Sequence, residues 1–431
     1  MNILFLTENF PPETNAAASR VFERACYWVK WKHRVTVITQ APNFPEGRLL
    51  QDYKNRWRQV EEISAIRVIR VKTYIAPNRG VVRRTLDFLS FMVTGFWAGL
   101  SGPKPDVVVA TSPQFFAAVA GHLVAALRRV PFVFELGDLW PASIAAVGAV
   151  KSNLALRLTE KLELHLYRRS EAVVALTVAF KENLVGRGIA AEKIAVVPNG
   201  VDTWRYGPAD KDKDLAREWG LEGRFVVGYV GTHGMAHALT NVLDAAERLK
   251  DRDSIRFLLA GAGAERDRLM ADAERRGLKN VIFMPMQPKD AMGKVWSLCD
   301  VALVHLKNDP LFAGVIPSKI FEAIASGVPV LLAAPKGEAS RIIAEDGAGL
   351  HVAPEDPAAL ADAVLELEGD PSRCKAMAEK GLLAAPTHSR EHQARHMAQV
   401  LEMAAAGRGA EASALTPQKP ESLGPAIKES P

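Results

Sequence analysis

The sequence has few cysteines, no apolar run long enough to cross a bilayer, and no pattern of zinc ligands. Cys26, Cys299 and Cys374 are the three cysteines among 431 residues, and they form no C-x-x-C pair. Such spacing argues against a disulfide framework and fits reduced thiols in a cytoplasmic protein. The first ten residues, MNILFLTENF, lack a basic segment before their apolar stretch, so we expect a buried strand there instead of a signal peptide.

Several catalytic and binding motifs are also missing. The sequence contains no P-loop and no supported G-x-S-x-G elbow, and its basic residues do not alternate with aromatics as in a nucleic-acid groove. Two strings, DKDKD at 210–214 and DRD at 251–253, match the D-x-D that some sugar transferases use for a metal. Because both lie in charged segments away from strand ends, we interpret them as solvated surface. We expect neither a bound metal nor a nucleic-acid partner.

Composition and charge indicate a globular protein of about two domains. Hydrophobic residues make up 48% of the chain and charged residues 24%, and its 431 residues exceed one ordinary core. Residues 1–200 hold 26 Lys and Arg against 16 Asp and Glu, whereas the rest hold 28 against 33. The basic first half therefore predicts contact with an anionic surface or partner.

Short apolar runs alternate with helical segments in both halves of the chain. Continuous apolar strands that alternate with helices are typical of parallel sheets buried on both faces. We therefore predict an α/β protein of two doubly wound, Rossmann-like domains facing across a cleft, with ligands at the strands' carboxyl ends. The predicted strands are residues 3–6, 35–39, 66–71, 106–110, 131–135, 172–176, 225–230, 255–260, 281–284, 301–306 and 330–333.

Proline, glycine and charge mark the segment borders. The string VPNGV at 197–201, followed by the charged run at 210–214, favours domains at residues 1–205 and 206–405. The polar and aromatic stretch 43–57 predicts a long loop with some helix. Residues 406–431 are rich in Ala, Pro, Gly, Ser and charged residues, which predicts a disordered tail.

The stretch 86–100, LDFLSFMVTGFWAGL, is apolar almost all round and follows Arg79, Arg83 and Arg84. It is shorter than the roughly 20 residues that span a bilayer. Two interpretations remain open. It is either a buried core helix, or a helix at a membrane interface whose arginines contact lipid headgroups, so that residues 79–100 bind the membrane surface.

The stretch 315–330, VIPSKIFEAIASGVPV, predicts a helix that is central to the second half. Pro317 and Ser318 favour its start, where the serine can satisfy open N–H groups, and a glycine and a proline end it. Lys319 and Glu322 share one face. A cation followed by a carboxylate suits a ligand with phosphate and hydroxyl groups; the alternative is a solvated ion pair.

Turns after three predicted strands carry further candidates. GYVGTHGM at 228–235 leads into a helix, and its glycines allow the close backbone approach that a diphosphate needs; the alternative is an ordinary turn. His233 either donates to a phosphate oxygen or caps this turn. LLAGAG at 258–263 is equally a plain turn, and MPMQ at 284–287 offers backbone groups to a base.

In the first half, ELGDLWP at 135–141 follows a buried strand. Asp138 is placed to accept a proton from a hydroxyl or to orient a sugar, and the alternative is a helix cap. Trp140 offers an apolar face to a sugar or a lipid.

These motifs resemble those of a known family. VIPSKIFEAIASGVPV is similar to the second half of family 4 glycosyltransferases, which have the GT-B fold. FPPETNAAASR, APNFPEG, TSPQFF, DLWPASI and VVPNGVD look like bacterial transferases of the fucosamine and colanic-acid type, which assemble surface polysaccharide. The similarity spans about residues 1–400, with the motifs in sequence order.

The resemblance implies a metal-independent enzyme that binds its nucleotide sugar with the second domain and its acceptor with the first. It implies roles in catalysis for Asp138 and Lys319, and an acceptor side that includes Asn15, Asp138 and Trp140. Glu322 would bind ribose hydroxyls, and Lys319 would stabilise the leaving diphosphate. The nucleotide-sugar residues implied are Gly231, Thr232, His233, Gly234, Met235, Pro285, Met286, Pro317, Ser318, Lys319 and Glu322.

The sequence departs from the family pattern at three places. Gly314 stands where the family has a glutamate that touches the donor sugar. Gly137 replaces the usual arginine before DLWP. The loop at 15–18, usually glycine-rich, reads Asn-Ala-Ala-Ala, so close backbone approach is less favoured there.

The resemblance leads us to expect a cytoplasmic protein, peripheral on the inner face of the membrane. We expect it to move a sugar, such as an N-acetylated amino sugar, from UDP to a polyprenyl-diphosphate-linked acceptor, with retention of configuration. Two alternatives remain. One is a nucleotide-sugar epimerase on the same fold, and the other is a non-catalytic subunit, which Gly314 brings into consideration.

Overall fold

The computed structural model describes residues 1–13, 15–44, 47–76, 81–112, 114–139 and 154–415, and the statements below concern these residues. The chain folds into two compact units. Unit 1 contains Met1–Asn199 together with the segment that starts at Arg390, and unit 2 contains Gly200–Ser389. Each unit has its own sheet and its own buried cores.

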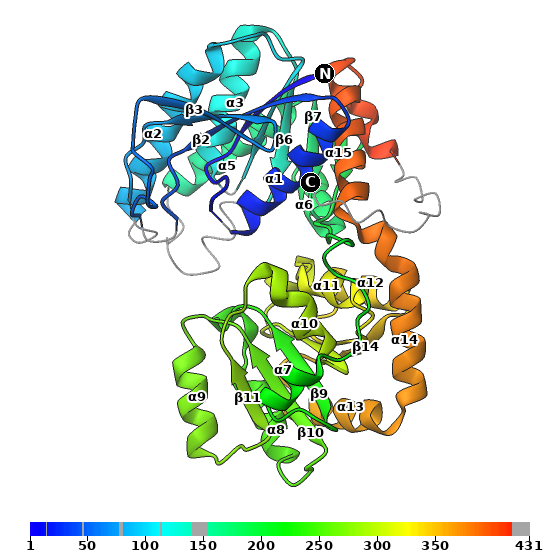
Figure 1. The fold of residues 1–431 in the computed structure, drawn as a ribbon. Coiled ribbons are helices and arrows are strands. Elements are labelled where there is room, and N and C mark those ends of the chain that lie inside the picture. The colour runs from blue at the N-terminus through cyan, green and yellow to red at the C-terminus, as the bar shows by residue number, and fades with distance from the viewer. Residues whose placement is uncertain (14, 45–46, 77–80, 113, 140–153, 416–431) are drawn as a thin grey trace. The chain divides into compact units, whose positions relative to one another are not determined.

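A sheet forms the centre of unit 1 (Figure 1). Its eight strands have the order β3-β4-β2-β1-β5-β6-β7-β8. Every neighbouring pair is parallel except β3 with β4. The central strands are apolar and fully buried, as expected of a sheet covered on both faces. The strands are β1 (Asn2–Leu6), β2 (Arg34–Gln40), β3 (Arg58–Ile63), β4 (Ile66–Val71), β5 (Val107–Thr111), β6 (Phe132–Leu136), β7 (Ala172–Ala175) and β8 (Ile194–Val196).

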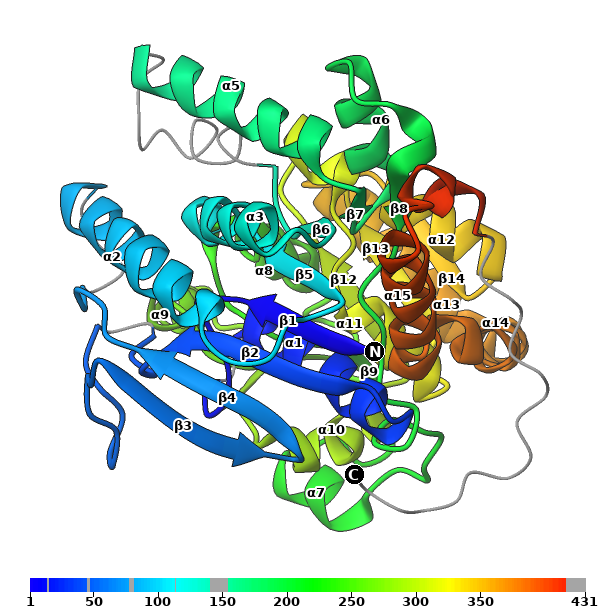
Figure 2. The same ribbon diagram turned by 90° about the horizontal axis from the view of Figure 1, so that it is seen from above.

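Helices cover both faces of this sheet (Figure 2). Phe91 of α2, Val124 of α3 and Leu166 of α5 belong to one core, and Trp28 of α1 and Met397 of α15 belong to the other. The helices are α1 (Ala16–Lys30), α2 (Val81–Leu100), α3 (Phe115–Arg128), α5 (Leu154–Arg169), α6 (Val178–Gly186) and α15 (Arg390–Ala405), with short 3-10 helices η1 (Ala191–Lys193) and η6 (Gly409–Ala414).

Unit 2 is built on a six-stranded sheet, all parallel, in the order β11-β10-β9-β12-β13-β14. The order reverses between β9 and β12, so the carboxyl ends of these strands open the crevice in which doubly wound folds bind ligands. The strands are β9 (Phe225–Val230), β10 (Ile255–Ala260), β11 (Val281–Met284), β12 (Val301–His305), β13 (Val330–Ala333) and β14 (Gly349–Val352).

Helices also cover both faces of the second sheet. Trp296 of α10 and Phe321 of α11 are buried in one core, and Leu243 of α8 and Val364 of α13 in the other. The helices are α7 (Lys213–Glu218), α8 (Thr240–Arg248), α9 (Arg266–Arg275), α10 (Met292–Ser297), α11 (Lys319–Ala325), α12 (Glu338–Asp346), α13 (Pro357–Gly369) and α14 (Pro371–Ala384), with 3-10 helices η2 (Met235–His237), η3 (Lys289–Ala291), η4 (Pro310–Gly314) and η5 (Ala385–His388).

The predicted Rossmann-like pairing is confirmed, and the predicted strands lie within a residue or so of those observed. Three strands were not predicted. β3 alternates exposed with half-buried residues and pairs antiparallel, β8 has three residues, and β14 is mostly half-buried. The described part of 43–57 holds no helix, contrary to the prediction.

The end of the chain packs differently from the prediction. α15 was assigned to the second domain, but it lies on α1 in unit 1, where the indole N–H of Trp28 donates to the carbonyl of Ala394 at 2.9 Å. Residues 406–415 also belong there, because Gly409 and Ala412 of η6 are buried. The rest of the predicted disordered tail lies outside the described residues.

The apolar stretch 86–100 forms most of α2, and only one side of this helix is buried. Phe91 is fully buried, whereas Leu86, Val93 and Trp97 are 47%, 51% and 66% exposed. The buried-helix interpretation is therefore only half right. No helix in the described part of the chain is long and apolar enough to cross a membrane.

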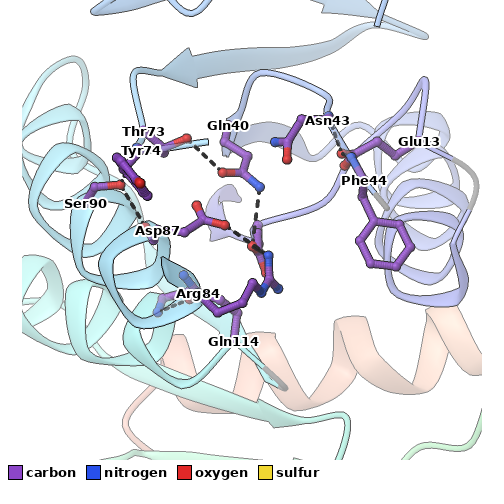
Figure 3. A network of polar contacts seen from close by, with 12 residues as sticks. Glu13, Gln40, Asn43, Phe44, Thr73, Tyr74, Arg84, Asp87, Ser90 and Gln114 are labelled. Atoms are coloured by element: carbon purple, nitrogen blue, oxygen red, sulfur yellow. Dashed lines mark hydrogen bonds and ion pairs between the residues drawn. The ribbon is translucent and has the colours of Figure 1, made fainter. Parts of the chain in front are cut away.

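The arginines that precede this stretch have different surroundings. Arg83 is exposed, Arg79 lies outside the described residues, and Arg84 points into unit 1 (Figure 3). Arg84 Nη1 is 2.9 Å from Asp87 Oδ2 and 3.4 Å from Glu8 Oε1. Arg84 is thus held by buried carboxylates and is not available to lipid headgroups, contrary to the prediction.

The same network ties α2 to the ends of three strands. Glu8, after β1, accepts a hydrogen bond from Gln40 Nε2 at the end of β2, at 3.3 Å. Gln40 in turn accepts one from the hydroxyl of Thr73, after β4, at 2.9 Å. Figure 3 shows Gln40, Thr73 and Arg84 converging from separate elements.

Burial governs the protonation of these carboxyl groups. It raises the pKa of Glu8 to about 8 and that of Asp87 to about 6, although the nearby Arg84 opposes both shifts. Burial also raises the pKa of Glu13, against three backbone N–H groups that donate to its oxygens. The Arg84 guanidinium thus faces two buried carboxyl groups, those of Glu8 and Asp87, and proton uptake relieves the excess negative charge.

Glu8→Gln should flatten the pH dependence of stability. Because the folded-state pKa of Glu8 is raised from 4.5 to about 8, its stabilising contribution is lost as pH rises through that interval. The slope from one such group is at most about 1.4 kcal/mol per pH unit. Chemical denaturation at several pH values between about 5 and 8 measures this difference. Glu62→Gln, at an exposed position on β3, is the control. Parallel curves for the wild type and Glu8→Gln would contradict the assignment.

Candidate functional site

Lys319 is the first residue of α11, and its ammonium group is buried without a hydrogen-bond partner. The Nζ atom lies 3.7 Å from the centroid of the Tyr229 ring. A Cβ at Gly231 would lie 2.8 Å from the same Nζ. The fold therefore presses this amine against the glycine turn after β9, and Gly231, with φ +139, is needed both for space and for backbone conformation.

The surroundings of Lys319 disfavour its charge. Burial lowers the pKa of Lys319 to about 7, and Glu322, one turn along α11, opposes this only in part. Transferring an ammonium group from water to a buried site without an ion-pair partner costs several kcal/mol of folding free energy. The site is therefore incomplete in charge, and an anionic ligand would complete it.

Three histidines surround the same turn. His233 is fully buried, and neither ring nitrogen has a partner. His237 and His305 are linked, since His305 Nδ1 lies 2.8 Å from the carbonyl oxygen of His237. Burial, with repulsion from Lys319, lowers the pKa of each histidine to about 4. At neutral pH the rings are uncharged, and each carries one N–H. Those of His237 and His305 lie against backbone carbonyls, whereas His233 can offer its N–H to a phosphate oxygen.

The turn at 258–263 supports the turn at 231–235. The N–H of Gly231 donates to the carbonyl of Ala260, and that of His233 donates to the carbonyl of Ala262, each at 2.9 Å. A Cβ at Gly261 would lie 1.9 Å from the oxygen of Gly231. These glycines allow the backbones of the two turns to pack in direct contact. This packing explains the glycines of LLAGAG at 258–263 without a contact to a ligand.

The start of α11 differs from the prediction. Ser318 has helical backbone angles, and its side chain makes no capping hydrogen bond. Pro317 and Ser318 therefore precede α11, but neither provides a side-chain N-cap for the helix. Glu322 is half-buried and lies beside Lys319 on α11.

The other predicted residues of unit 2 lie along the same sheet edge. Thr232 accepts a hydrogen bond through its carbonyl from the Tyr229 hydroxyl at 2.7 Å. Pro285 and Met286 directly follow β11 and are exposed. Gly234 and Met235 line a hollow of about 640 Å³ together with Asn241, Asp244, Glu265, Arg268, Lys307 and Glu355.

Gly314 ends η4 and has no side chain to offer a ligand. The preceding residue is fixed by close packing, because a Cβ at Gly337 would lie 2.1 Å from the carbonyl oxygen of Ala313. At this point the loop presents backbone groups where the resembled family has a glutamate.

The predicted acceptor-side residues belong to unit 1. The Asn15 side chain accepts from the N–H of Ala18 at 2.9 Å and so caps α1. The N–H of Asp138 lies 3.4 Å from the hydroxyl of Ser112. Trp140 lies outside the described residues. Asn15 thus has a structural role, and Asp138 follows β6 as predicted.

An arginine from α1 occupies the space beside Gly137. A Cβ at Gly137 would lie 2.7 Å from Arg20 Nη2. Burial alone would raise the pKa of Glu135, but Arg20 and Arg24 hold it below its ordinary value. The usual arginine before DLWP is absent, and a guanidinium from another element takes up that space.

Sequence reasoning missed Tyr229, His237, His305 and Arg266. The fold brings them to the site from β9, η2, β12 and α9. The spacing of His233 and His237 was a signal, but nothing in the sequence places the end of β12 beside them. Among the described residues, no group of His, Cys, Asp and Glu could hold a metal ion.

Comparison with known proteins accounts for both units. Residues 15–200 match the model of a glycosyl transferase 4-like domain, and residues 211–384 match that of the glycosyl transferases group 1. The chain is 28% identical over 335 residues to WcaI of Escherichia coli K12, which is named as a colanic acid biosynthesis glycosyl transferase. That alignment covers 76% of this chain and 82% of WcaI.

Solved structures share the fold. Anabaena HepE, in a complex with UDP-glucose, superposes with a TM-score of 0.68 at 18% identity, covering 93% of this chain and 99% of HepE. WaaG, a glycosyltransferase involved in lipopolysaccharide biosynthesis, superposes with a TM-score of 0.65 at 17% identity, covering 93% and 99%. The chain therefore belongs to the family 4 glycosyltransferases of the GT-B fold, whose members are retaining and metal-independent.

Proposed function

We propose that this glycosyltransferase moves a sugar from a UDP-sugar to a polyprenyl-diphosphate-linked saccharide during assembly of a bacterial surface polysaccharide. The observation that carries the donor half of this proposal is the buried, unpartnered ammonium of Lys319 against the turn at Gly231. A diphosphate supplies the negative charge that this site lacks.

Most of the predicted residues of unit 2 then have distinct tasks. Lys319 stabilises the charge that develops on the diphosphate as the sugar–phosphate bond breaks. The turn at 231–235 lies against the phosphates, and the neutral His233 ring donates to a phosphate oxygen. Glu322, beside Lys319 on α11, accepts from the ribose hydroxyls, and the backbone at Pro285 and Met286 reads the base.

The acceptor half rests on unit 1. Asp138, after β6, orients the acceptor hydroxyl or accepts its proton, and Trp140 offers an apolar face to the sugar. A UDP-glucose complex of HepE and the colanic-acid name of WcaI support a UDP donor and a polysaccharide product. An N-acetylated amino sugar is our proposed donor sugar, and retention of configuration our proposed outcome. The enzyme works at the cytoplasmic face of the membrane, where a lipid-linked acceptor is presented.

A non-catalytic subunit on this fold is the second candidate, because Gly314 removes the glutamate that the family places near the donor sugar. Such a subunit would bind the nucleotide without turnover. The experiments below separate the two.

UDP-sugars should raise the melting temperature more than GDP- or dTDP-sugars do. A ligand at 100 times its Kd stabilises the folded state by about 2.7 kcal/mol, so a thermal-shift series ranks the bases. Adding a lipid extract with polyprenyl-diphosphate-linked saccharides should then give a labelled, lipid-soluble product. Binding without transfer would favour the non-catalytic subunit, and isomerisation of the UDP-sugar without acceptor would favour an epimerase.

Lys319→Met should abolish donor binding without loss of stability. Methionine fills similar space but removes a buried charge that has no partner in the free protein, so the melting temperature without ligand should be unchanged or higher. Turnover should fall by roughly 100-fold or more if the ammonium stabilises the leaving diphosphate. Lys336→Met, at an exposed position in the same unit, is the control. Wild-type turnover in Lys319→Met would refute the role of this amine.

A further inference from the structure

Helices α2, α3 and α5 form one continuous layer over one face of the sheet in unit 1 (Figure 2). α2 and α3 are in close contact, since a Cβ at Gly99 would lie 2.6 Å from a methyl group of Val124. α3 and α5 meet through the rings of His122 and His165, with centroids 6.4 Å apart. The outer sides of the three helices therefore belong to one surface.

This surface exposes large apolar side chains on each helix. Trp97 on α2 and Leu127 on α3 are 66% and 64% exposed, and Leu158 on α5 is 57% exposed. The exposed positions recur at helical spacing, so each helix presents one apolar stripe outward. We call these residues the three-helix surface: Leu86, Val93, Trp97, Leu123, Leu127, Leu158 and Leu162.

Basic side chains share the same helix sides. Arg83 lies three residues before Leu86, Lys161 lies three after Leu158, and Arg169 lies seven after Leu162; all three are exposed. Three- and seven-residue spacings place side chains on one side of a helix.

Acidic groups are nearly absent from these sides. Asp87 on α2 and Glu163 on α5 are buried. Glu160 is the exposed acid in the described parts of the three helices, and it lies 3.1 Å from Arg187. The exposed charge of this layer is therefore positive.

We propose that the three-helix surface docks this enzyme onto an anionic lipid bilayer, with Trp97 and the leucines at the headgroup boundary and Arg83, Lys161 and Arg169 on phosphate groups. Apolar residues interspersed with cations, with little acid among them, complement a bilayer that is apolar within and negative at its surface. The inference rests on the proposed function in one respect, because a lipid-linked acceptor gives a reason for membrane docking. It differs from the sequence prediction in using three helices and in leaving out Arg84.

Flotation with vesicles tests this directly. The full chain should float with phosphatidylcholine vesicles that contain about 30% phosphatidylglycerol, and much less with phosphatidylcholine alone. Raising the salt to about 0.5 M should weaken the association without abolishing it, because screening acts on the charges and not on the apolar contacts. Equal binding to both vesicle types would overturn the proposed role of the cations.

Variants locate the surface. Trp97→Gln with Leu127→Gln should release the protein from anionic vesicles. Replacing Arg83, Lys161 and Arg169 by alanine should weaken binding by about fivefold per residue. Leu383→Gln, which alters an 81% exposed leucine on α14, is the matched control and should float like the wild type. All these positions are exposed, so melting temperatures should stay the same.

Two other results would overturn the proposal. If sedimentation reveals a dimer that Trp97→Gln with Leu127→Gln dissociates, a second copy covers the surface. Alternatively, the wild type fails to bind vesicles. The UDP-glucose thermal shift, measured in the same variants, keeps the two ideas separate. A retained shift with no flotation refutes the docking surface alone, whereas flotation without any nucleotide response refutes the proposed function.

Discussion

The central constraint in unit 2 is an ammonium group, that of Lys319, which is buried without a hydrogen-bond partner. Lys319 has the face of Tyr229 and the backbone of Gly231 as neighbours, and burial brings its pKa to about 7. Removing such a charge from water without pairing it works against folding. The rest of the unit, with its two packed cores, supplies the stability that holds this strained group in place. In the function that we propose, this preorganised cation would stabilise charge at the reacting diphosphate without reorganising during the reaction.

In unit 1, by contrast, buried and half-buried arginines form ion pairs. Arg24 and Arg20 are paired with Glu135, and Arg84 lies between Glu8 and Asp87. These pairs link helices to strand ends, and the carboxyl groups that remain in excess take up protons. These paired charges therefore fix the local geometry of the strand ends in unit 1. The two units share a sheet design. Arg20, Arg24 and Arg84 in unit 1 each have a carboxylate partner, whereas Lys319 in unit 2 has no hydrogen-bond partner.

The sequence predicted most of the fold because buried parallel strands are continuous apolar runs. β4, β9 and β10 begin and end where the pattern placed them. β3 and β14 were not predicted, because they are partly exposed and therefore lack a continuous apolar run. The position of α15 could not be predicted, since its apolar residues fit either unit equally well until Trp28 and its neighbours are placed in space.

Within the site, local spacing identified Lys319 and Glu322, and family resemblance joined them to the turn at 231–235. Neither could predict that His305, from a separate strand, lies at the site. Neither could predict that the Lys319 amine has no hydrogen-bond partner. The sequence also did not show in which direction the arginine side chains of α2 point. Arg83 and Arg84 are adjacent in sequence, yet Arg83 is exposed and Arg84 is half-buried and paired with Glu8. Tertiary contacts decide such cases, and one sequence alone does not contain them.

Proton uptake on donor binding is the most direct test of this account. Calorimetric titration with UDP-glucose in two buffers of different ionisation enthalpy gives the number of protons taken up. At about pH 8 the free Lys319 amine is mostly neutral, and a bound diphosphate should restore its charge, so about one proton should be taken up per nucleotide sugar. Lys319→Arg, which stays charged throughout, should take up none. Uptake near zero in the wild type, with donor bound, would contradict the claim that the Lys319 amine forms an ion pair with the diphosphate of the donor.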